Sequence, residues 1–513
     1  MCAAIALLLP LLSYLRDAKG LHQYPAAGPF GIAALTPLWL MYHNWYGIRW
    51  KAIEKAHKQL GAVVRISPNH LSFTDPGAYK DIYGHKADIV KDVFYSNMGG
   101  STPNMADATD RADHARKRKY FAAIFSAKNV GMLEPRVMQC VGKLLDCLKV
   151  KATGGQVAET DRFPVREDGS FDVRPWLNMF TYDAIGSMMW SESFGFLERG
   201  DDLCAAEAAN GETKQVHAME VFQKGVWFSV FCAHLPPLAY NLLRYVTSKS
   251  TWTESASDFS SIARHKANKR LTTLPEQPDI FSQFPTETDA KGRPPLPMWE
   301  IVAESSVMLN AGNDTTQTTL TNNILLLSIH PEVQSKLRTI LTTSIPASSR
   351  PVAPYAALSQ TPYLRAVIDE TFRILTPQRF GLPRRTVSPS LIAGHTIAPS
   401  VTISSPLSEL HVDASLFTKP KEWIPERWLA DNTDFSETER ANLKEFVMPF
   451  TTGSRACIGR NLAYMEVSIA LAALVMAFEW ELGDGGIDEC FGQFERITSN
   501  ATKLIVRARP IEG

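Results

Sequence analysis

Residues 450–459 read "FTTGSRACIG", and this stretch decides how the rest of the chain is interpreted. Cys457 stands in a glycine-spaced loop, and a long apolar run follows it. Three roles are open to its thiol: a packed core side chain, a nucleophile, or a ligand for a metal. A nucleophile needs a base, and no histidine lies nearby in the sequence, although such a partner can come from far along the chain.

The neighbours of Cys457 favour a metal ligand. A core thiol has no need of the two glycines, whereas Gly453 lets the backbone turn tightly and Gly459 permits close approach of a flat cofactor. The apolar run "IGRNLAYMEVSIALAALVMAFEWEL" predicts a buried helix whose N-terminal N–H groups and positive dipole end face the sulfur. That field favours the thiolate form of the cysteine.

The composition excludes several classes of protein. Lys+Arg and Asp+Glu both number 53 among the 513 residues, so the formal net charge is zero and a generalised nucleic-acid binder is not expected. The chain has seven cysteines, an odd number, with no CxxC and no Cys/His cluster at zinc spacing. A disulfide scaffold or a zinc module is therefore not expected, and the folded part belongs in a reducing compartment.

The N-terminus predicts attachment to a membrane. "MCAAIALLLPLLSYL" carries no charge before Arg16, and at this length it is shorter than the roughly 20 residues of a full span. It lacks the basic start and clear cleavage site of a signal peptide, so we expect a short anchor over residues 1–20 rather than an interfacial or processed segment. The apolar stretch 30–42 would assist it. Arg16 and Lys19 place the rest of the chain on the cytosolic side.

The sequence predicts a mainly α fold with small β-sheets. "YPAAGPFG" marks a Pro/Gly hinge over 21–34, and a single large domain over 35–513 follows it. Residues 62–73 predict a β-hairpin on either side of Pro68-Asn69, and residues 391–405 predict a second one.

Two further helices are bounded by proline. Residues 298–330 contain no proline and lie between Pro297 and Pro331, which predicts a helix about 50 Å long at about 1.5 Å per residue. Residues 361–377 predict a shorter helix, with Thr361 as its cap and Pro362 in its first turn.

The middle of the long helix reads "NAGNDTTQTT", residues 310–319, and is unusually polar. Gly312 costs a helix about 1 kcal/mol relative to alanine. One interpretation is a solvated, threonine-rich face. The other is a helix opened at Gly312, with Asp314 and the Thr315 hydroxyl placed to pass protons to something bound in the groove.

A third motif is "ETFR", in which Glu370 and Arg373 share a helix face at i, i+3 spacing. Arg427, in "PERW", supplies a second arginine. Together these three side chains predict a structural lock that holds a loop in place, since breaking such a buried group leaves an uncompensated charge.

These motifs, in this order, resemble the cytochrome P450 family. The cysteine loop matches the family pattern Phe-x-x-Gly-x-Arg-x-Cys-x-Gly, and the mid-helix motif matches Ala-Gly-x-Asp/Glu-Thr. The matching residues are Phe450, Gly453, Arg455, Cys457 and Gly459, then Ala311, Gly312, Asp314 and Thr315. Glu370 with Arg373 matches Glu-x-x-Arg, and 425–428 matches Pro-Glu-Arg-Phe with Trp428 in place of phenylalanine. The resemblance spans nearly the whole chain and implies the P450 fold.

The resemblance implies a haem b cofactor with the Cys457 thiolate as its axial ligand, which favours O–O cleavage. It implies that Asp314 and Thr315 deliver protons. It also implies that Arg118, Arg384 and Arg455 bind the haem propionates, with Arg385 as an alternative to Arg384. His114 stands where the family has tryptophan. Residues 116–119, "RKRK", are either a solvated face or a docking surface for an acidic electron donor.

The activity that the resemblance implies is that of a membrane-anchored haem-thiolate monooxygenase at the endoplasmic reticulum, with its catalytic domain facing the cytosol. Electrons would come from NADPH through NADPH–cytochrome P450 reductase, with cytochrome b5 as a second donor. One atom of O2 would enter a small organic substrate, expected to be a fungal secondary metabolite because several stretches look like fungal microsomal enzymes. The pocket is expected to use the 95–110 loop, Phe222–Phe231, Met308, Ala311, Thr315 and Phe380–Leu382.

Three alternatives stay open. One is hydroxylation of benzoate at the para position, although no cationic anchor for its carboxylate can be identified in the sequence. Another is a haem-thiolate isomerase or dehydratase that acts without O2, against which the intact Asp314–Thr315 pair argues. The third is a haem-binding protein without catalysis.

Overall fold

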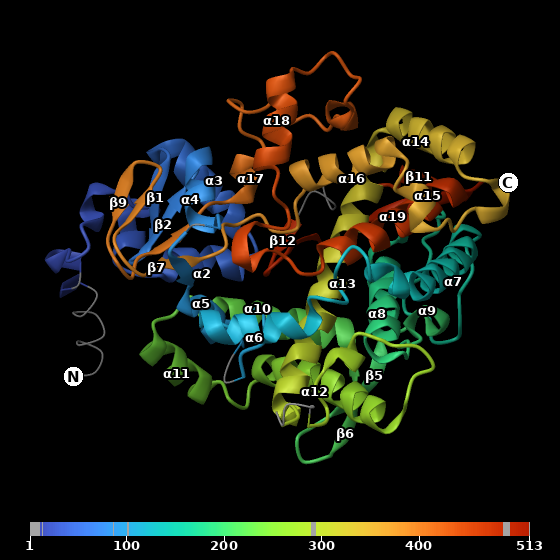
Figure 1. The fold of residues 1–513 in the computed structure, drawn as a ribbon, viewed down its shortest axis with the longest axis horizontal. Coiled ribbons are helices and arrows are strands. Elements are labelled where there is room, and N and C mark those ends of the chain that lie inside the picture. The colour runs from blue at the N-terminus through green and yellow to red at the C-terminus, as the bar shows by residue number, and fades with distance from the viewer. Residues whose placement is uncertain are drawn as a thin grey trace.

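The long helix α13 (Met298–Ile329) crosses the middle of the molecule and positions everything else (Figure 1). The computed structural model describes residues 11–12, 14–85, 87–99, 102–288, 294–485 and 493–511. Pro297 precedes α13 and Pro331 begins the next helix, so the predicted 298–330 helix is confirmed. Its 32 residues span about 48 Å.

Helices make up most of the described chain, as predicted. In chain order the other α-helices are α2 (Leu38–Trp45), α3 (Arg49–Leu60), α4 (Pro76–Tyr83), α5 (Val93–Gly99), α6 (Arg111–Phe121), α7 (Glu134–Ala152), α8 (Arg174–Trp190), α9 (Phe196–Arg199), α10 (Ala218–Ala233), α11 (Pro237–Val246) and α12 (Thr251–Thr272). The list continues with α14 (Pro331–Ser344), α15 (Tyr355–Leu358), α16 (Pro362–Ile374), α17 (Leu407–Leu410), α18 (Glu437–Phe446) and α19 (Arg460–Ala477). Polar caps begin several of them; the Asp110 carboxylate, for example, accepts the backbone N–H of Asp113 at 2.7 Å at the start of α6.

The β-structure is small and gathers mainly at one side of the molecule (Figure 1, left). Its largest sheet has the order β1-β2-β10-β7-β3, in which only the β2–β10 pair is parallel. The strands of this sheet are β1 (Val63–Ser67), β2 (His70–Phe73), β3 (Ile89–Lys91), β7 (Arg384–Thr386) and β10 (Thr402–Ser404). The others are β4 (Phe171–Asp172), β5 (Leu203–Glu207), β6 (Thr213–His217), β8 (Ser390–Ile392), β9 (His395–Ile397), β11 (Phe478–Leu482), β12 (Gln493–Glu495), β13 (Ser499–Ala501) and β14 (Ile505–Pro510).

The first predicted hairpin is confirmed as β1 and β2, and the second is only half right. Residues 390–397 form the hairpin β8–β9, but β10 leaves it and joins the large sheet between β2 and β7. The prediction failed there because alternating residues cannot tell which strand will pair with which.

Two local predictions about helices are wrong. The Thr361 side chain makes no capping hydrogen bond to α16, and within the described residues its hydroxyl has no partner. The helix also does not open at Gly312, since α13 continues through that residue. Instead, Gly312 permits close packing: a Cβ there would lie 3.0 Å from Ile185 on α8.

The main core forms where α13 packs against α8, α12, α16 and α19. The apolar helix predicted after Cys457 is confirmed as α19, whose residues from Leu462 to Met476 are almost all buried. Within the described residues α19 is also the one helix long and apolar enough to cross a membrane, but 78% of it is buried inside the protein. It is therefore a core helix.

The predicted anchor lies mostly outside the described residues, which omit 1–10 and 13. The segment proposed as a hinge runs alongside the sheet: Ala26 bridges to Arg65 of β1, and the Ala27 N–H donates to the Arg65 carbonyl at 3.0 Å. Ala27 is fully buried.

Candidate functional site

A cavity of about 1100 Å³ lies between α13, α10, α12 and the cysteine loop. Cys457 and Thr315 both line it, so two motifs that are far apart in sequence face one space. The cavity therefore gathers the cysteine loop and the mid-helix motif into one candidate site.

The cysteine loop has a conformation that only glycine permits at one point. Gly453 has φ 76°, and a Cβ on it would lie 2.5 Å from the carbonyl oxygen of Tyr83. The Cys457 N–H donates to the Phe450 carbonyl at 2.9 Å and closes the loop. Thr451, also at positive φ, shows that the turn is tight on both sides.

Cys457 directs its sulfur into the cavity from a position just before α19. Burial raises the pKa of its thiol above the usual value, while the Gly459 N–H and the Arg118 and Arg460 guanidinium groups act in the opposite direction. These donors and positive charges are the groups that would stabilise a thiolate.

Basic side chains converge beside the cysteine loop; we call Lys91, His114, Arg118, Arg384 and Arg455 the basic cluster. Arg118 donates to the Ala456 carbonyl at 2.8 Å, and Arg455 donates to the Ala108 carbonyl at 2.8 Å. Arg384 is 4% exposed, and its Nη1 has no partner among the described residues. The structure thus brings together the three arginines predicted to bind the propionates, Arg118, Arg384 and Arg455, and places His114 beside them.

The positive charges of the basic cluster lower one another's pKa values. Burial and the neighbouring Arg455 and Arg118 lower the pKa of His114 to about 4. Burial and Arg384 lower the pKa of Arg455 to about 10. Buried positive charges that disfavour one another need an anion, and an unpartnered guanidinium nitrogen points to the same need. The carboxylates of a haem fit this cluster.

Two residues of this region were not predicted from the sequence. Lys91 lines the cavity and lies 4.0 Å over the ring of Tyr95, whose buried hydroxyl has no partner within the described chain. Both come from a short strand and helix about 20 residues before α6, with no local motif. Only their nearness to Arg384 in the folded chain reveals them.

Asp314 and Thr315 face different sides of α13. Thr315 lines the cavity, and its hydroxyl donates to the Ala311 carbonyl at 2.7 Å. Asp314 is 5% exposed, and its carboxylate is bonded instead by Thr498 and Asn500. Successive residues of a helix are rotated by about 100°, so neighbours in sequence do not share a face.

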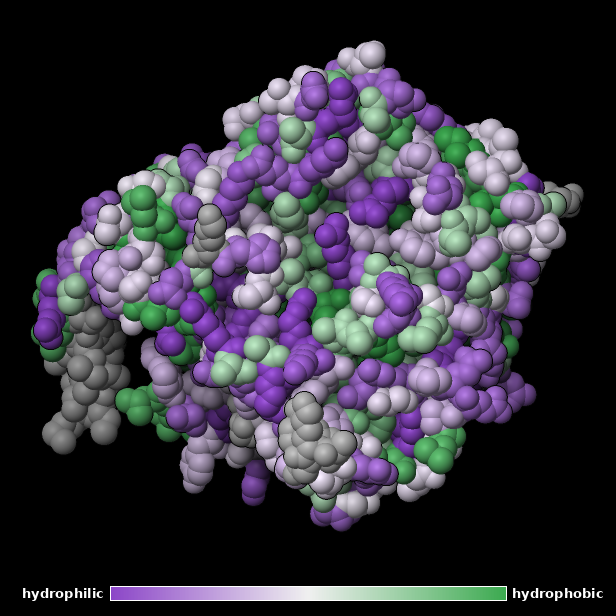
Figure 2. All heavy atoms as spheres, in the orientation of Figure 1, coloured by the Kyte–Doolittle hydropathy of each residue, from purple (hydrophilic) through white to green (hydrophobic). Residues whose placement is uncertain are grey.

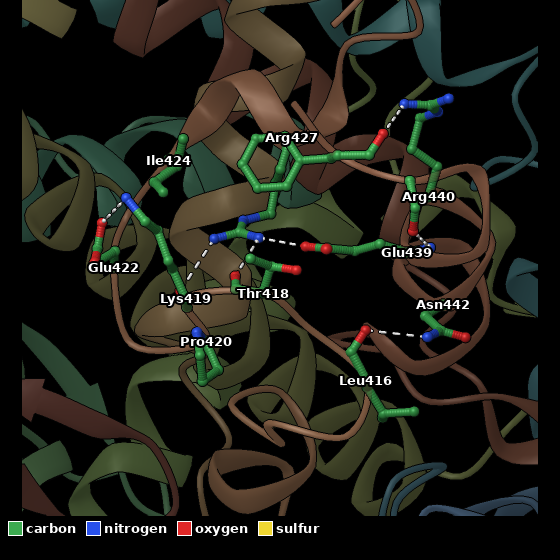
Figure 3. Close-up of polar contacts among 12 residues, drawn as sticks. Leu416, Thr418, Lys419, Pro420, Glu422, Ile424, Arg427, Glu439, Arg440 and Asn442 are labelled. Carbon is green, nitrogen blue, oxygen red and sulfur yellow. Dashed lines mark hydrogen bonds and ion pairs between the residues drawn. The ribbon is translucent and has the colours of Figure 1, made fainter. Parts of the chain in front are cut away.

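The structure brings Glu370, Arg373 and Arg427 together as a fully buried group. Arg373 binds Glu370 through two nitrogens at 2.9 and 2.7 Å, and the Arg427 Nε donates to Glu370 at 2.9 Å. Arg427 also bonds Glu439 at 2.6 Å and the carbonyls of Thr418 and Lys419 (Figure 3).

Trp428, which replaces the family's phenylalanine, also takes part. Its indole N–H donates to Glu370 at 2.8 Å, so both carboxylate oxygens are fully used. The group thereby ties α16 to the loop before α18.

The basic run 116–119 is not one surface. Lys117 is 1% exposed and lies between Glu300 at 2.8 Å and Glu304 at 3.0 Å, so neither interpretation of the run fits it. Arg116 pairs with Glu300 at 2.5 Å as well. The sequence could not reveal these ion pairs because both glutamates belong to α13, more than 180 residues after Lys117. Lys119 remains exposed and carries no ion pair within the described residues.

The pocket prediction is largely confirmed, with two exceptions. The 95–110 loop, α10, Ala311, Thr315 and Leu382 contribute to the lining, but Met308 and Phe380 do not. Ser306 and Asn310, which were not predicted, line the cavity about two turns and one turn before Asp314, respectively. In the part of the chain that the structure describes, neither side chain has a hydrogen-bond partner.

Comparisons with known proteins agree with the site. The family model for Cytochrome P450 matches residues 33–505. The chain is 31% identical to "Benzoate 4-monooxygenase bphA" of Aspergillus niger over 496 residues, covering 94% of this chain and 92% of that protein. It is 30% identical to "Trichothecene C-15 hydroxylase" of Fusarium sporotrichioides, over 84% of this chain and 81% of that one.

Among solved structures, the fold matches the crystal structure of the cytochrome P450DA heme domain. The TM-score is 0.72 at 15% identity, and the match covers 92% of this chain and 95% of the other.

Proposed function

Given that this chain belongs to the cytochrome P450 family and is a haem-thiolate monooxygenase, we propose that Cys457 ligates the haem and that the cavity beside Thr315 receives a neutral, oxygen-bearing organic substrate. The observation that carries the proposal is the thiol at the cavity wall beside a buried cluster of basic side chains with an unpartnered nitrogen.

Different residues around the cavity would bind the iron and the propionates of the haem. Cys457 would bind the iron, and Gly459 and Arg118 would stabilise its negative charge. Arg384, Arg455, Lys91 and the Tyr95 hydroxyl would bind the propionates. When bound, the haem supplies the redox chemistry by which O2 is split and one oxygen atom enters the substrate.

A Cys457→Ala variant tests the ligand. We expect it to lose the reduced-CO spectrum of a thiolate-ligated haem, whereas Cys140→Ala, a buried thiol outside the cavity, should retain it. A thiolate-type spectrum in Cys457→Ala would refute the assignment.

The cavity wall supports a substrate with a hydrogen-bonding oxygen. Ser306 and Asn310 offer polar groups that have no hydrogen-bond partner in the described chain, on a wall that also contains apolar residues such as Phe222, Val226 and Ile497. A buried polar group gains from a ligand that satisfies it and loses from one that does not. Oxygenated small metabolites, such as products of fungal biosynthetic clusters, have this chemistry.

Benzoate is the second candidate substrate because a relative is named a benzoate 4-monooxygenase. Its carboxylate needs a cation. Arg244 and Lys249 line the cavity but are exposed at its α11–α12 side, and Lys91 and Arg455 belong to the basic cluster. Haem spin-state titrations with benzoate and with neutral oxygenated metabolites would separate the two.

Electrons would come from NADPH through cytochrome P450 reductase, with cytochrome b5 as a further donor. Lys119 and Arg460 are exposed near the cysteine loop and suit an acidic partner. The isomerase and the non-catalytic alternatives predict no coupled consumption of NADPH and O2. An oxygenated product formed in step with both, with reductase present, would exclude them.

We also propose attachment to the endoplasmic reticulum membrane, with exposed apolar side chains of α2 and α11 in the lipid surface. Leu238 is 86% exposed and Tyr245 is 80% exposed on α11, and Leu38 is 60% exposed on α2. Both helices lie at the same side of the molecule, and hydrophobic residues are visible at the place of α11 (Figures 1 and 2).

A further inference from the structure

The Asp314 carboxylate has no direct route to the cavity. It does not line the cavity wall, and it is held against the turn between β12 and β13. The Asn500 Nδ2 donates to its Oδ1 at 3.0 Å, and the Thr498 hydroxyl donates to its Oδ2. Any proton that leaves this carboxyl group must therefore pass through another polar group.

Thr498 contacts the Asp314 carboxylate and also lines the cavity. It is 2% exposed and lies in the β12–β13 turn, where it contacts Asp314 and also lines the cavity together with Thr315. The Thr315 hydroxyl, by contrast, is bonded to its own helix at the Ala311 carbonyl and makes no hydrogen bond to Asp314. Geometry thus favours a hydroxyl almost 200 residues away over the one next in sequence.

We propose that Thr498 relays protons from Asp314 to the cavity, an inference that rests on the proposed monooxygenase function. For the transfer, the Thr498 hydroxyl turns from Asp314 toward the cavity; its oxygen takes the proton of the protonated Asp314 carboxyl group while its own proton passes to an acceptor in the cavity. Thr498 ends as a neutral hydroxyl and Asp314 as a carboxylate, and a proton from solvent restores the carboxyl group. The relay supplies protons that the reduction of O2 consumes.

Asn500 acts as a positioning residue in this arrangement. Its Nδ2 also donates to the Thr498 hydroxyl oxygen at 3.0 Å, and its Oδ1 accepts the Thr318 hydroxyl of α13. The amide therefore fixes the carboxylate and the relay hydroxyl relative to one another. Arg174 and Arg496 lie close enough to interact with the Asp314 charge, so the carboxylate is not an isolated buried anion.

The test compares Thr498→Val, which keeps the shape and removes the hydroxyl, with Thr498→Ser, which restores it. We expect Thr498→Val to divert severalfold more NADPH electrons into hydrogen peroxide and to change the solvent isotope effect on product formation. Thr498→Ser should behave as the wild type. Ile497→Val is the matched control, since it alters the same cavity wall without a hydroxyl.

Readouts other than turnover separate the relay from mere structure. Haem content and the reduced-CO spectrum should be the same in Thr498→Val and Ile497→Val. The infrared band of the Asp314 carboxyl, identified by its loss in Asp314→Asn, should shift in Thr498→Val and not in Ile497→Val.

Unchanged coupling in Thr498→Val, or an unshifted band, would overturn the inference. A shifted band in an enzyme that binds haem but oxygenates no substrate with reductase would instead refute the proposed function.

Discussion

At the residue scale, single side chains in this site are defined by what burial does to them. Beside the Cys457 loop, Arg384 is buried and its Nη1 has no partner within the described residues. Burial and the neighbouring arginines lower the pKa of His114. Glu466 on α19 follows the same physics with the opposite charge. It is 2% exposed, one of its oxygens has no partner within the described residues, and burial raises its pKa to about 8.

Glu466→Gln should therefore stabilise the protein in a pH-dependent way. Between about pH 4.5 and pH 8, the Glu466 carboxyl group is protonated in the folded protein but ionised in the unfolded protein. Stability of the wild type is thus lost as pH rises toward about 8, by up to about 1.4 kcal/mol per pH unit. Glutamine cannot ionise and avoids this loss.

Thermal melts at pH 5 and pH 8 measure the effect. The Gln variant should gain on the wild type at pH 8 and lose most of that gain at pH 5. The reverse order would mean that Glu466 is ionised and paired in the folded protein.

Gly453→Ala should disrupt the cysteine loop. The new Cβ would lie 2.5 Å from the Tyr83 carbonyl oxygen, in addition to the strain of φ 76°. Gly154→Ala is the matched control because Gly154 has φ 80° with nothing within 4 Å, so that it carries the strain alone, about 1–2 kcal/mol. Haem content and thermal unfolding should fall far more for Gly453→Ala; equal losses would show that strain, not the clash, governs this position.

At the scale of elements, buried charges join segments that the sequence keeps apart. Glu370, Arg373 and Arg427 link α16 to the loop before α18, and Lys117 of α6 lies between two glutamates of α13. The first link follows a local motif and could be predicted. The second could not, because nothing in "RKRK" distinguishes the lysine that turns inward.

Glu370→Gln should cost about 3–5 kcal/mol of folding free energy, since it leaves the buried Arg373 without its carboxylate and Arg427 with Glu439 alone. Lys419→Ala removes a surface pair with Glu422 in the same loop, in which both side chains are about 60% exposed (Figure 3). That control should cost no more than about 1 kcal/mol. Denaturant unfolding compares them, and a similar small cost for both would refute a structural lock.

At the scale of the whole molecule, α2 and α11 share one side, and α13 crosses the middle (Figure 1). The exposed apolar side chains of this side include those of α11, whose Tyr240 and Arg244 also line the cavity. The face shown in Figure 2 mixes hydrophilic and hydrophobic residues.

Leu238→Asp should lower binding of the protein to phospholipid vesicles severalfold, because a charge enters the proposed lipid contact. Leu274→Asp is the control, as that side chain is 94% exposed but belongs to neither α2 nor α11. Co-sedimentation with vesicles measures both. Equal binding of the two variants would remove α11 from the membrane face.

The sequence alone determined the cysteine loop, the proline-bounded α13, the buried α19 and hence the family. Each of these depends on local rules: where glycine and proline may stand, and how apolar residues repeat. Only the tertiary structure decided which strand β10 joins, that Lys117 is buried, and that Lys91 joins the basic cluster with Tyr95 beside it. It also turned Asp314 away from Thr315 and toward Thr498, because a helix separates neighbours by rotation while folding brings a distant turn into contact.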